Sequence, residues 1–160
     1  MTSATRLLTV TCAVGSALAA GAFLTFSTFT MSGLKRLPPS QGAAAMQSIN
    51  RQATTPLFML VLFGTGLACL VLGIQSARHL DEPFAVHRLV ACAIYVVGVV
   101  VLTGAYHVPR NDMLASFDPN SAEGMAYWAT YLREWVPMNH VRTVAPLISS
   151  IVLAMSLTST

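Results

Sequence analysis

The chain has 160 residues, of which 54% are hydrophobic and only 9% are charged. Soluble domains carry roughly 25% charged residues, so this chain lacks the side chains to cover a water-facing surface. Its length suits one domain, residues 1–160, and no second block of composition interrupts it. The net charge of +3 is small and the Lys and Arg residues are scattered, which argues against a nucleic-acid partner.

Four apolar segments without Asp, Glu or Lys follow one another along the chain, at residues 7–30, 56–77, 84–106 and 137–157. Each is close to the ~20 residues that a helix needs to cross the ~30 Å hydrocarbon core of a bilayer. In lipid every backbone N–H and C=O needs an internal partner, which favours helices for runs of this length. We therefore predict an all-α, multi-pass integral membrane protein of the cell membrane, folded as a four-helix bundle.

The first segment has an alternative interpretation as a cleaved signal peptide. Arg6 precedes an apolar run, and Ala17-Leu18-Ala19 resembles a cleavage site. The apolar character nevertheless continues to Phe29, so we expect a retained helix.

The links between the segments are unequal. The link at residues 78–83 is short, so the second and third segments should be antiparallel neighbours. The links at 31–55 and 107–136 are longer and more polar, with short helices expected at 40–52 and from a Ser121 cap to Arg133, before a new start at Pro137. Four spans put both long links on one side of the membrane, and the distribution of Lys and Arg favours the cytoplasm for that side.

The three cysteines, Cys12, Cys69 and Cys92, all lie in apolar runs and show no C-x-x-C spacing. Their odd number and their setting favour buried thiols that act as small apolar residues, over a disulfide framework or a zinc site.

Polar residues gather on the side of the long links in three clusters, within residues 46–51, 106–112 and 135–143. A four-helix bundle can bring these clusters around one pocket between the helices. The side chains expected to bind a substrate there are Gln47, Asn50, Arg51, Tyr106, Asn111, Trp135, Asn139 and His140.

Three residues of these clusters are candidates for catalysis: His107, Asp112 and Arg142. Arg142 lies inside an apolar run, where an arginine costs about 2.5–3.5 kcal/mol at mid-bilayer. It either extends to the lipid headgroups or faces the bundle interior and binds an oxyanion or Asp112. His107 is either an ordinary interfacial residue or a general base oriented by Asp112.

A metal site is the alternative for the same region. His107, Asp112 and His140 are two imidazoles and one carboxylate, a set that binds iron in non-haem oxygenases and leaves iron or copper open here. No tightly spaced His pair supports it, so we expect neither a metal nor another cofactor.

Two stretches carry a resemblance to a known family. His107-Val108-Pro109-Arg110-Asn111-Asp112-Met113-Leu114 and Asn139-His140-Val141-Arg142-Thr143, with Leu37-Pro38-Pro39 and Met46-Gln47-Ser48-Ile49-Asn50 before them, resemble the anthrone oxygenase family of small four-helix membrane proteins. By this resemblance His107, Asn111, Asn139 and Arg142 are functional positions, supported by Gln47 and Asn50. Members with assigned activity oxidise anthrones to anthraquinones with molecular oxygen, apparently without a cofactor.

The resemblance implies an oxidoreductase, specifically a monooxygenase, that oxidises an apolar polycyclic or phenolic substrate with molecular oxygen. His107 would take the proton, Arg142 with Asn139 or Asn111 would stabilise the enolate oxygen, and Trp135 with Tyr106 would flank the rings. Two other classes stay open: a protein that binds or transports a lipophilic small molecule, and a structural subunit of a membrane complex. A homo-oligomer is compatible with the sequence.

Overall fold

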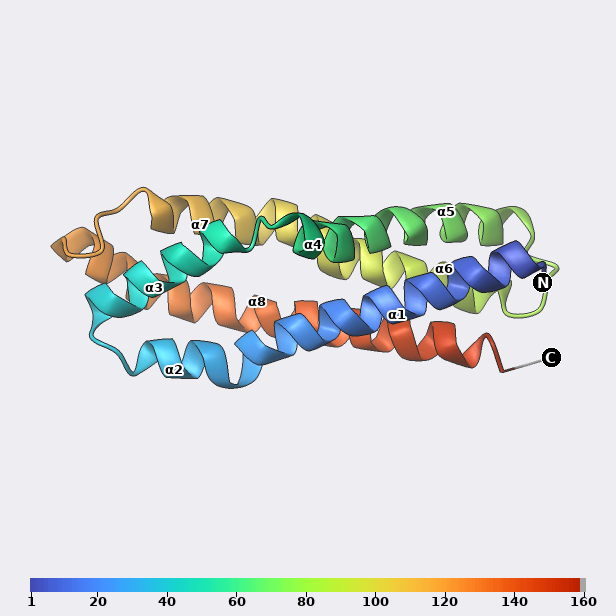
Figure 1. Cartoon of the computed structure of the whole chain (residues 1–160), viewed down its shortest axis with the longest axis horizontal. Helices are drawn as coiled ribbons and strands as arrows, with labels where there is room; N and C mark the ends of the chain where they lie inside the picture. The colour runs from blue at the N-terminus through green and yellow to red at the C-terminus, as the bar shows by residue number, and fades with distance from the viewer. Residues whose placement is uncertain (159–160) are drawn as a thin grey trace.

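The computed structural model describes residues 1–158, and all regular structure in them is helical. Four long helices run along the molecule and a shorter fifth joins two of them (Figure 1). The first, Ser3–Lys35, consists of α1 (Ser3–Thr25), a π-helical segment at Phe26–Thr30 and α2 (Met31–Lys35). The short helix is α3 (Pro39–Gln52).

The other long helices also change their winding along their length. Pro56–Arg78 consists of α4 (Pro56–Met59), a π-helical segment at Leu60–Gly64 and α5 (Thr65–Arg78). Ala85–Ala115 consists of α6 (Ala85–Tyr95), π-helical segments at Val96–Val101 and Thr103–His107, and α7 (Val108–Ala115). The last helix, α8, is continuous over Ala122–Met155.

The four long helices form a ring in which α1 packs against α5 and α8, and α6 packs against the same two helices. This confirms the predicted helical bundle, with α5 and α6 as neighbours. Small residues permit the close approach of helices, because a Cβ at Gly15 would overlap the Thr65 side chain and one at Gly98 would meet Ala145.

The predicted break before the fourth segment is wrong. The helix that begins at the Ser121 cap, whose hydroxyl accepts from the N–H of Gly124 at 2.9 Å, continues through Pro137 and Pro146 to Met155. Each proline removes one i→i−4 hydrogen bond, but packing along α1 and α6 holds the helix in one piece. The two links expected to be long are therefore mostly helical.

Three helices are long and apolar enough to cross a membrane: Ser3–Lys35, Pro56–Arg78 and Ala85–Ala115. Large apolar side chains are exposed along their outer faces, among them Leu18, Leu67 and Val97. The helix α8 is less apolar, since it carries Asn139 and Arg142, but both of these side chains are buried against other helices. The chain is thus a membrane protein by the length and composition of its helices.

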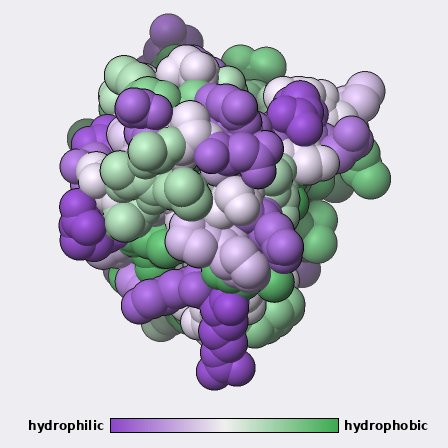
Figure 2. All heavy atoms as spheres, turned by 90° about the vertical axis from the view of Figure 1, so that its left-hand side faces the viewer, coloured by the Kyte–Doolittle hydropathy of each residue, from purple (hydrophilic) through white to green (hydrophobic). Residues whose placement is uncertain are grey.

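The two ends of the bundle differ in their connections. The N-terminus, the α5–α6 link and the end of α8 lie at one end, and the α2–α3 and α7–α8 links lie at the other (Figure 1). Seen from the α3 end, many hydrophilic side chains gather on the face, as expected for a surface outside the hydrocarbon (Figure 2).

At one end of the bundle, α3 stands in line with α4 and α5 and completes the ring of four helices there. It packs against α2, α7 and α8. The chain leaves helical geometry at residues 53–55, between α3 and α4. One corner of the bundle is thus made of two helices placed end to end (Figure 1).

The core consists of two clusters along the axis. One surrounds the buried and unbonded thiols of Cys12, Cys69 and Cys92, as predicted, and the other contains Trp128, Tyr131 and Trp135.

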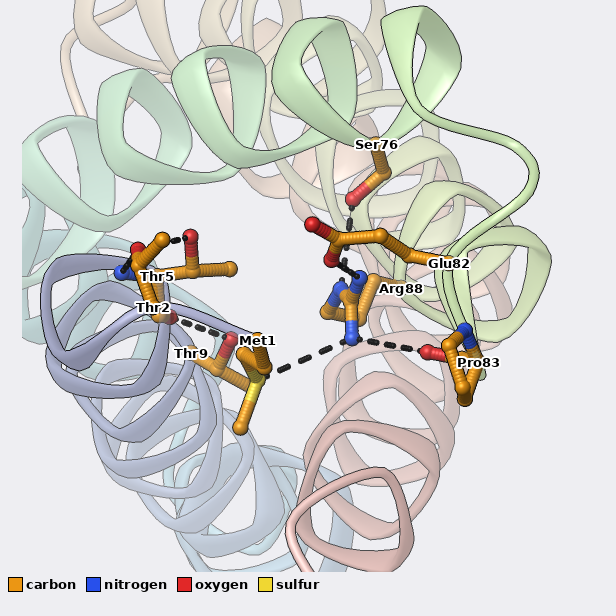
Figure 3. Close-up of polar contacts among 8 residues, drawn as sticks. All are labelled: Met1, Thr2, Thr5, Thr9, Ser76, Glu82, Pro83 and Arg88. Carbon is orange, nitrogen blue, oxygen red and sulfur yellow. Dashed lines mark hydrogen bonds and ion pairs between the residues drawn. The ribbon is translucent and has the colours of Figure 1, made fainter.

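A buried arginine closes the end of the bundle that holds the N-terminus (Figure 3). Arg88 is 2% exposed and donates to the Glu82 carboxylate at 3.1 Å, to the Pro83 carbonyl at 3.2 Å and to the Ser76 hydroxyl at 3.4 Å. Its Nη1 also lies 3.7 Å from the Met1 sulfur. This guanidinium therefore ties the α5–α6 link to the ends of α1 and α5.

We expect Glu82→Ala to lower the free energy of unfolding by about 3 kcal/mol, because it leaves the Arg88 cation buried without its carboxylate. Arg88→Met should cost less, since Glu82 is 32% exposed and can turn to water. Thermal or SDS denaturation in detergent micelles measures both, with the exposed Arg78→Met as control. The opposite order of the two effects would contradict this account.

Candidate functional site

A partly enclosed cavity of about 180 Å³ lies where the two core clusters meet. Most of its wall is apolar and aromatic, from Phe23, Phe26, Met46, Ile49, Ala53, Phe58, Met59, Leu62, Phe63, Val108 and Trp135. Its polar wall residues are Asn50, Thr54, Thr103, Asn111 and Arg142. A cavity of this composition suits a flat apolar ligand with a few polar atoms.

The π-helical segments supply part of this wall. Phe26, Leu62 with Phe63, and Thr103 come from the wide turns of three different long helices. A π-helical turn adds a residue to the helix and changes the direction of the side chains around it, and such turns are frequent at functional sites. The local widening thus turns residues of three helices toward one space.

Arg142 is the charged group of the cavity. It is only 5% exposed, and no carboxylate pairs with it within residues 1–158. Its guanidinium carbon lies 4.4 Å from the centre of the Phe23 ring and 5.0 Å from that of Trp135, within the range of cation–π attraction. A buried cation held by aromatic faces and neutral groups is available to an anion that enters the cavity.

Asn139 holds this guanidinium in place. Its Oδ1 accepts from Arg142 Nη2 at 2.8 Å, while its Nδ2 donates to the Phe23 carbonyl at 3.0 Å and to the Ser27 hydroxyl at 2.9 Å. Thr103 accepts a longer bond of 3.4 Å from Nη1. The Arg142 Nε has no partner among the described residues. Asn139 therefore orients Arg142 and, unlike Arg142, does not line the cavity.

Asn111 presents an amide group from α7. Its Oδ1 accepts from the Tyr131 hydroxyl at 2.7 Å and from the Trp135 indole at 3.0 Å. An indole N–H can only donate, so the amide oxygen of Asn111 must point toward Trp135, and its Nδ2 group must point away from Trp135. Since Asn111 lines the cavity, its amide N–H groups are available as donors there.

Asn50 adds a further donor from α3. It lines the cavity, and its buried Nδ2 has no partner in the described part of the chain. Together with Arg142 and Asn111, it gives the cavity N–H donors from three helices and no lining carboxylate. Such a set of donors fits carbonyl or enolate oxygens of a ligand.

His107 lies beside this site and does not line it. Its ring is fully buried, and neither ring nitrogen has a partner within the described residues. It packs edge to face on Trp135, with the ring centres 5.0 Å apart, and Tyr106 lies 5.5 Å away. The indole of Trp135 thus contacts both the imidazole and the cavity.

The structure does not bring Asp112 or His140 to the site. Five residues after His107, Asp112 is about 140° around the helix and is exposed, so it pairs with neither His107 nor Arg142. His140 is exposed because its neighbour Asn139 faces inward. The alternative iron or copper ligands His107, Asp112 and His140 do not converge, and no group of three metal-binding side chains is found in residues 1–158.

Three further residues expected in the site, Gln47, Arg51 and Tyr106, do not line the cavity. Gln47 donates to the carbonyls of Leu114 at 2.8 Å and Phe117 at 3.0 Å, which fixes α3 against the end of α7. Arg51 is exposed. Tyr106 donates to the Glu134 carbonyl at 3.3 Å and carries the Arg110 guanidinium on its ring.

Sequence reasoning missed Phe23, Phe26, Phe58 and Thr103 as wall residues. The aromatic residues resemble any others in a membrane segment, and nothing in the sequence indicates the π-helical turns. A usable signal existed on α8, where Trp128, Tyr131, Trp135, Asn139 and Arg142 follow a 3-4-4-3 spacing that defines one helix face. The assumed break at Pro137 concealed that pattern.

We expect Arg142→Met to lose little or no stability, because removal of a buried cation without a carboxylate partner offsets the loss of the donor to Asn139 Oδ1. Asn139→Leu should instead lose about 1–3 kcal/mol, since it leaves the Phe23 carbonyl without its donor. Thermal denaturation in detergent micelles compares the two. Equal losses in both variants would indicate that the guanidinium serves the fold.

Comparison with known proteins identifies the family of the chain. The model of the family described as anthrone oxygenase matches residues 58–152, which include Asn111, Trp135, Asn139 and Arg142. No curated protein and no solved structure matches the chain. Because the family match covers more than half of the sequence, this helical membrane protein belongs to the anthrone oxygenase family.

Proposed function

We propose that the chain is a membrane-embedded oxygenase that oxidises an apolar polycyclic or phenolic substrate, of the anthrone type, with molecular oxygen. The observation that carries the proposal is the unpaired Arg142 cation in the wall of an aromatic cavity, with the amides of Asn50 and Asn111 in the same wall. We place the protein in the cell membrane, where such a substrate partitions.

The proposed oxidation proceeds through an anion of the substrate. An anthrone carries a ketone opposite an acidic methylene carbon, and loss of one proton from that carbon spreads the negative charge over the rings and onto the ketone oxygen. Arg142 would hold this enolate oxygen, with Asn111 or Asn50 as a second donor. In a cavity with a mostly apolar wall such contacts favour the anion more strongly than they would in solution.

The electron-rich anion can then reduce oxygen directly. One electron passes from the carbanion to O2, and the two radicals combine to form a C–O bond. Loss of the second proton from the same carbon breaks the O–O bond and leaves a ketone. Overall a CH2 group and O2 become a C=O group and H2O, which balances without a further reductant.

His107 is our candidate acceptor of the first proton. It is buried, its ring nitrogens are free among the described residues, and it contacts Trp135. Because it does not line the cavity, the proton would reach it through a displacement of the Trp135 indole or through a water molecule. Asp112 has no part in this step, since it is exposed.

Oxygen uptake with anthrone, measured in detergent or nanodiscs, tests the assignment. We expect Arg142→Met to lower kcat/KM by about 10²–10³-fold, as for the loss of an oxyanion donor. His107→Phe should lower it by about 10²-fold. The matched control is Arg133→Gln, an exposed arginine on the same helix, and it should keep the parent rate.

Parent-level oxygen uptake in both Arg142→Met and His107→Phe would refute the site. A lipophilic molecule that copurifies with the protein and emerges unchanged after incubation in air would instead favour a binding or transport protein.

The proposed reaction uses no metal or other cofactor. We expect the purified protein to contain iron and copper far below one atom per chain, and to keep its oxygen uptake after treatment with EDTA. Metal analysis by mass spectrometry together with the uptake assay measures both. Iron or copper near one atom per chain, with loss of activity on its removal, would contradict the cofactor-free mechanism.

A further inference from the structure

A surface groove of about 460 Å³ adjoins the cavity on the flank of the bundle. Phe26, Ile49, Ala53 and Phe58 belong to the walls of both. The rest of the groove is contributed by α1, by α3 and by the link after α3. The two hollows are therefore separated by side chains that they share, with no helix between them.

The groove lies at the break between α3 and α4. Residues 53–55 are not helical; Ala53 is half-buried, Thr54 is exposed, and both line the cavity. Non-helical backbone in a membrane protein is tolerated where it is buried in protein or lines a cavity. The groove therefore lies along the corner where α3 and α4 meet end to end (Figure 1).

The volumes indicate how the two hollows are used. The cavity of about 180 Å³ is smaller than the roughly 300–1,000 Å³ common for drug-sized ligands. Its N–H donors, Arg142, Asn111 and Asn50, belong to the inner cavity and are absent from the groove wall. A ligand with several fused rings therefore has room for its oxygen-bearing part inside and needs the groove for the remainder.

We propose that the groove is a second subsite, which takes the apolar end of a flat polycyclic ketone that reaches the cavity sideways from the bilayer. The inference rests on the proposed function and adds to it a second binding position and a lateral route of entry, with the hydrogen-bond acceptors of the ligand on its inner part. The half-buried rings of Phe26 and Phe58 flank the passage, where they can pack on the aromatic faces of the ligand.

Binding of two quinones of different length tests the proposal without turnover. The probes are 9,10-anthraquinone, with three rings, and 1,4-naphthoquinone, with two, added to protein in phosphatidylcholine nanodiscs. Both carry carbonyl acceptors and quench tryptophan fluorescence. In a Trp128→Phe background, Trp135 in the cavity wall is the remaining tryptophan of the two in the sequence.

Ala53→Phe places a ring in the shared wall and should narrow the passage. We expect it to weaken anthraquinone binding by about tenfold or more and naphthoquinone binding by no more than about twofold. The matched control is Ala17→Phe, the same change at an exposed position of α1, and it should alter neither affinity. Equal weakening of both probes, or no effect on either, would overturn the second subsite.

Phe58→Ala is the opposite change and covers the case in which Ala53→Phe does not fold. It widens the passage and should raise the affinity for a four-ring quinone, 5,12-naphthacenequinone, several-fold relative to naphthoquinone. An unchanged ratio would count against the subsite, as would the absence of saturable anthraquinone binding to the Trp128→Phe protein.

The two proposals fail in different ways. Ring-number selectivity that depends on Ala53, without oxygen uptake from anthrone, would leave the subsite standing and refute the oxygenase. Oxygen uptake from anthrone that depends on Arg142 but does not change in Ala53→Phe would support the oxygenase and refute the second subsite.

Discussion

The structure depends on one constraint, that a polar group inside an apolar bundle must find its partners among other side chains and the backbone. Most of the buried polar side chains meet this requirement, as Gln47 does with two carbonyls and Asn139 does with both ends of its amide. The unpartnered nitrogens are few in the described chain, and those of Asn50, His107 and Arg142 lie in or next to one cavity. An unmet hydrogen bond costs free energy, so their gathering supports the proposal that a ligand binds there.

The same constraint explains where the helices change their geometry. A regular α-helix presents its side chains at fixed angles, and four regular helices with well-matched faces would fill the space between them. Three of the π-helical segments, Phe26–Thr30, Leu60–Gly64 and Thr103–His107, and the break at residues 53–55 depart from that regularity at the level of the cavity. At the level of the cavity the fold thus leaves a space that side chains do not fill.

Sequence alone was sufficient for the fold class, because hydropathy and segment length determine which residues can face lipid. It was also sufficient for the family and for Arg142, Asn111 and Trp135 as members of one cluster. It was insufficient for Asp112 and His140, since nearness in sequence is not nearness in space. On a helix a shift of one residue is a rotation of 100°, so His140 turns outward while Asn139 turns inward.

The cavity itself could not be predicted, because it depends on side chains from the four long helices and α3, which meet only after packing. Phe58 illustrates the difficulty: it is one of seven phenylalanines, and only the break before α4 places it between groove and cavity. Aromatic side chains in membrane segments face lipid, packing partners and ligands alike, and composition does not separate these settings.

The contrast between two buried arginines brings these points together. Arg88 donates to a carboxylate, a carbonyl and a hydroxyl. These hydrogen bonds join the α5–α6 link to the ends of α5 and α6. Arg142 is equally enclosed, but it has only an amide and a distant hydroxyl, with two aromatic faces around it. If both served stability, selection for burial would favour a carboxylate near each, because an uncompensated buried cation is costly. The missing partner of Arg142 supports the proposal that the cavity binds an anion, and the aromatic wall around it favours one whose charge is spread over a flat ring system.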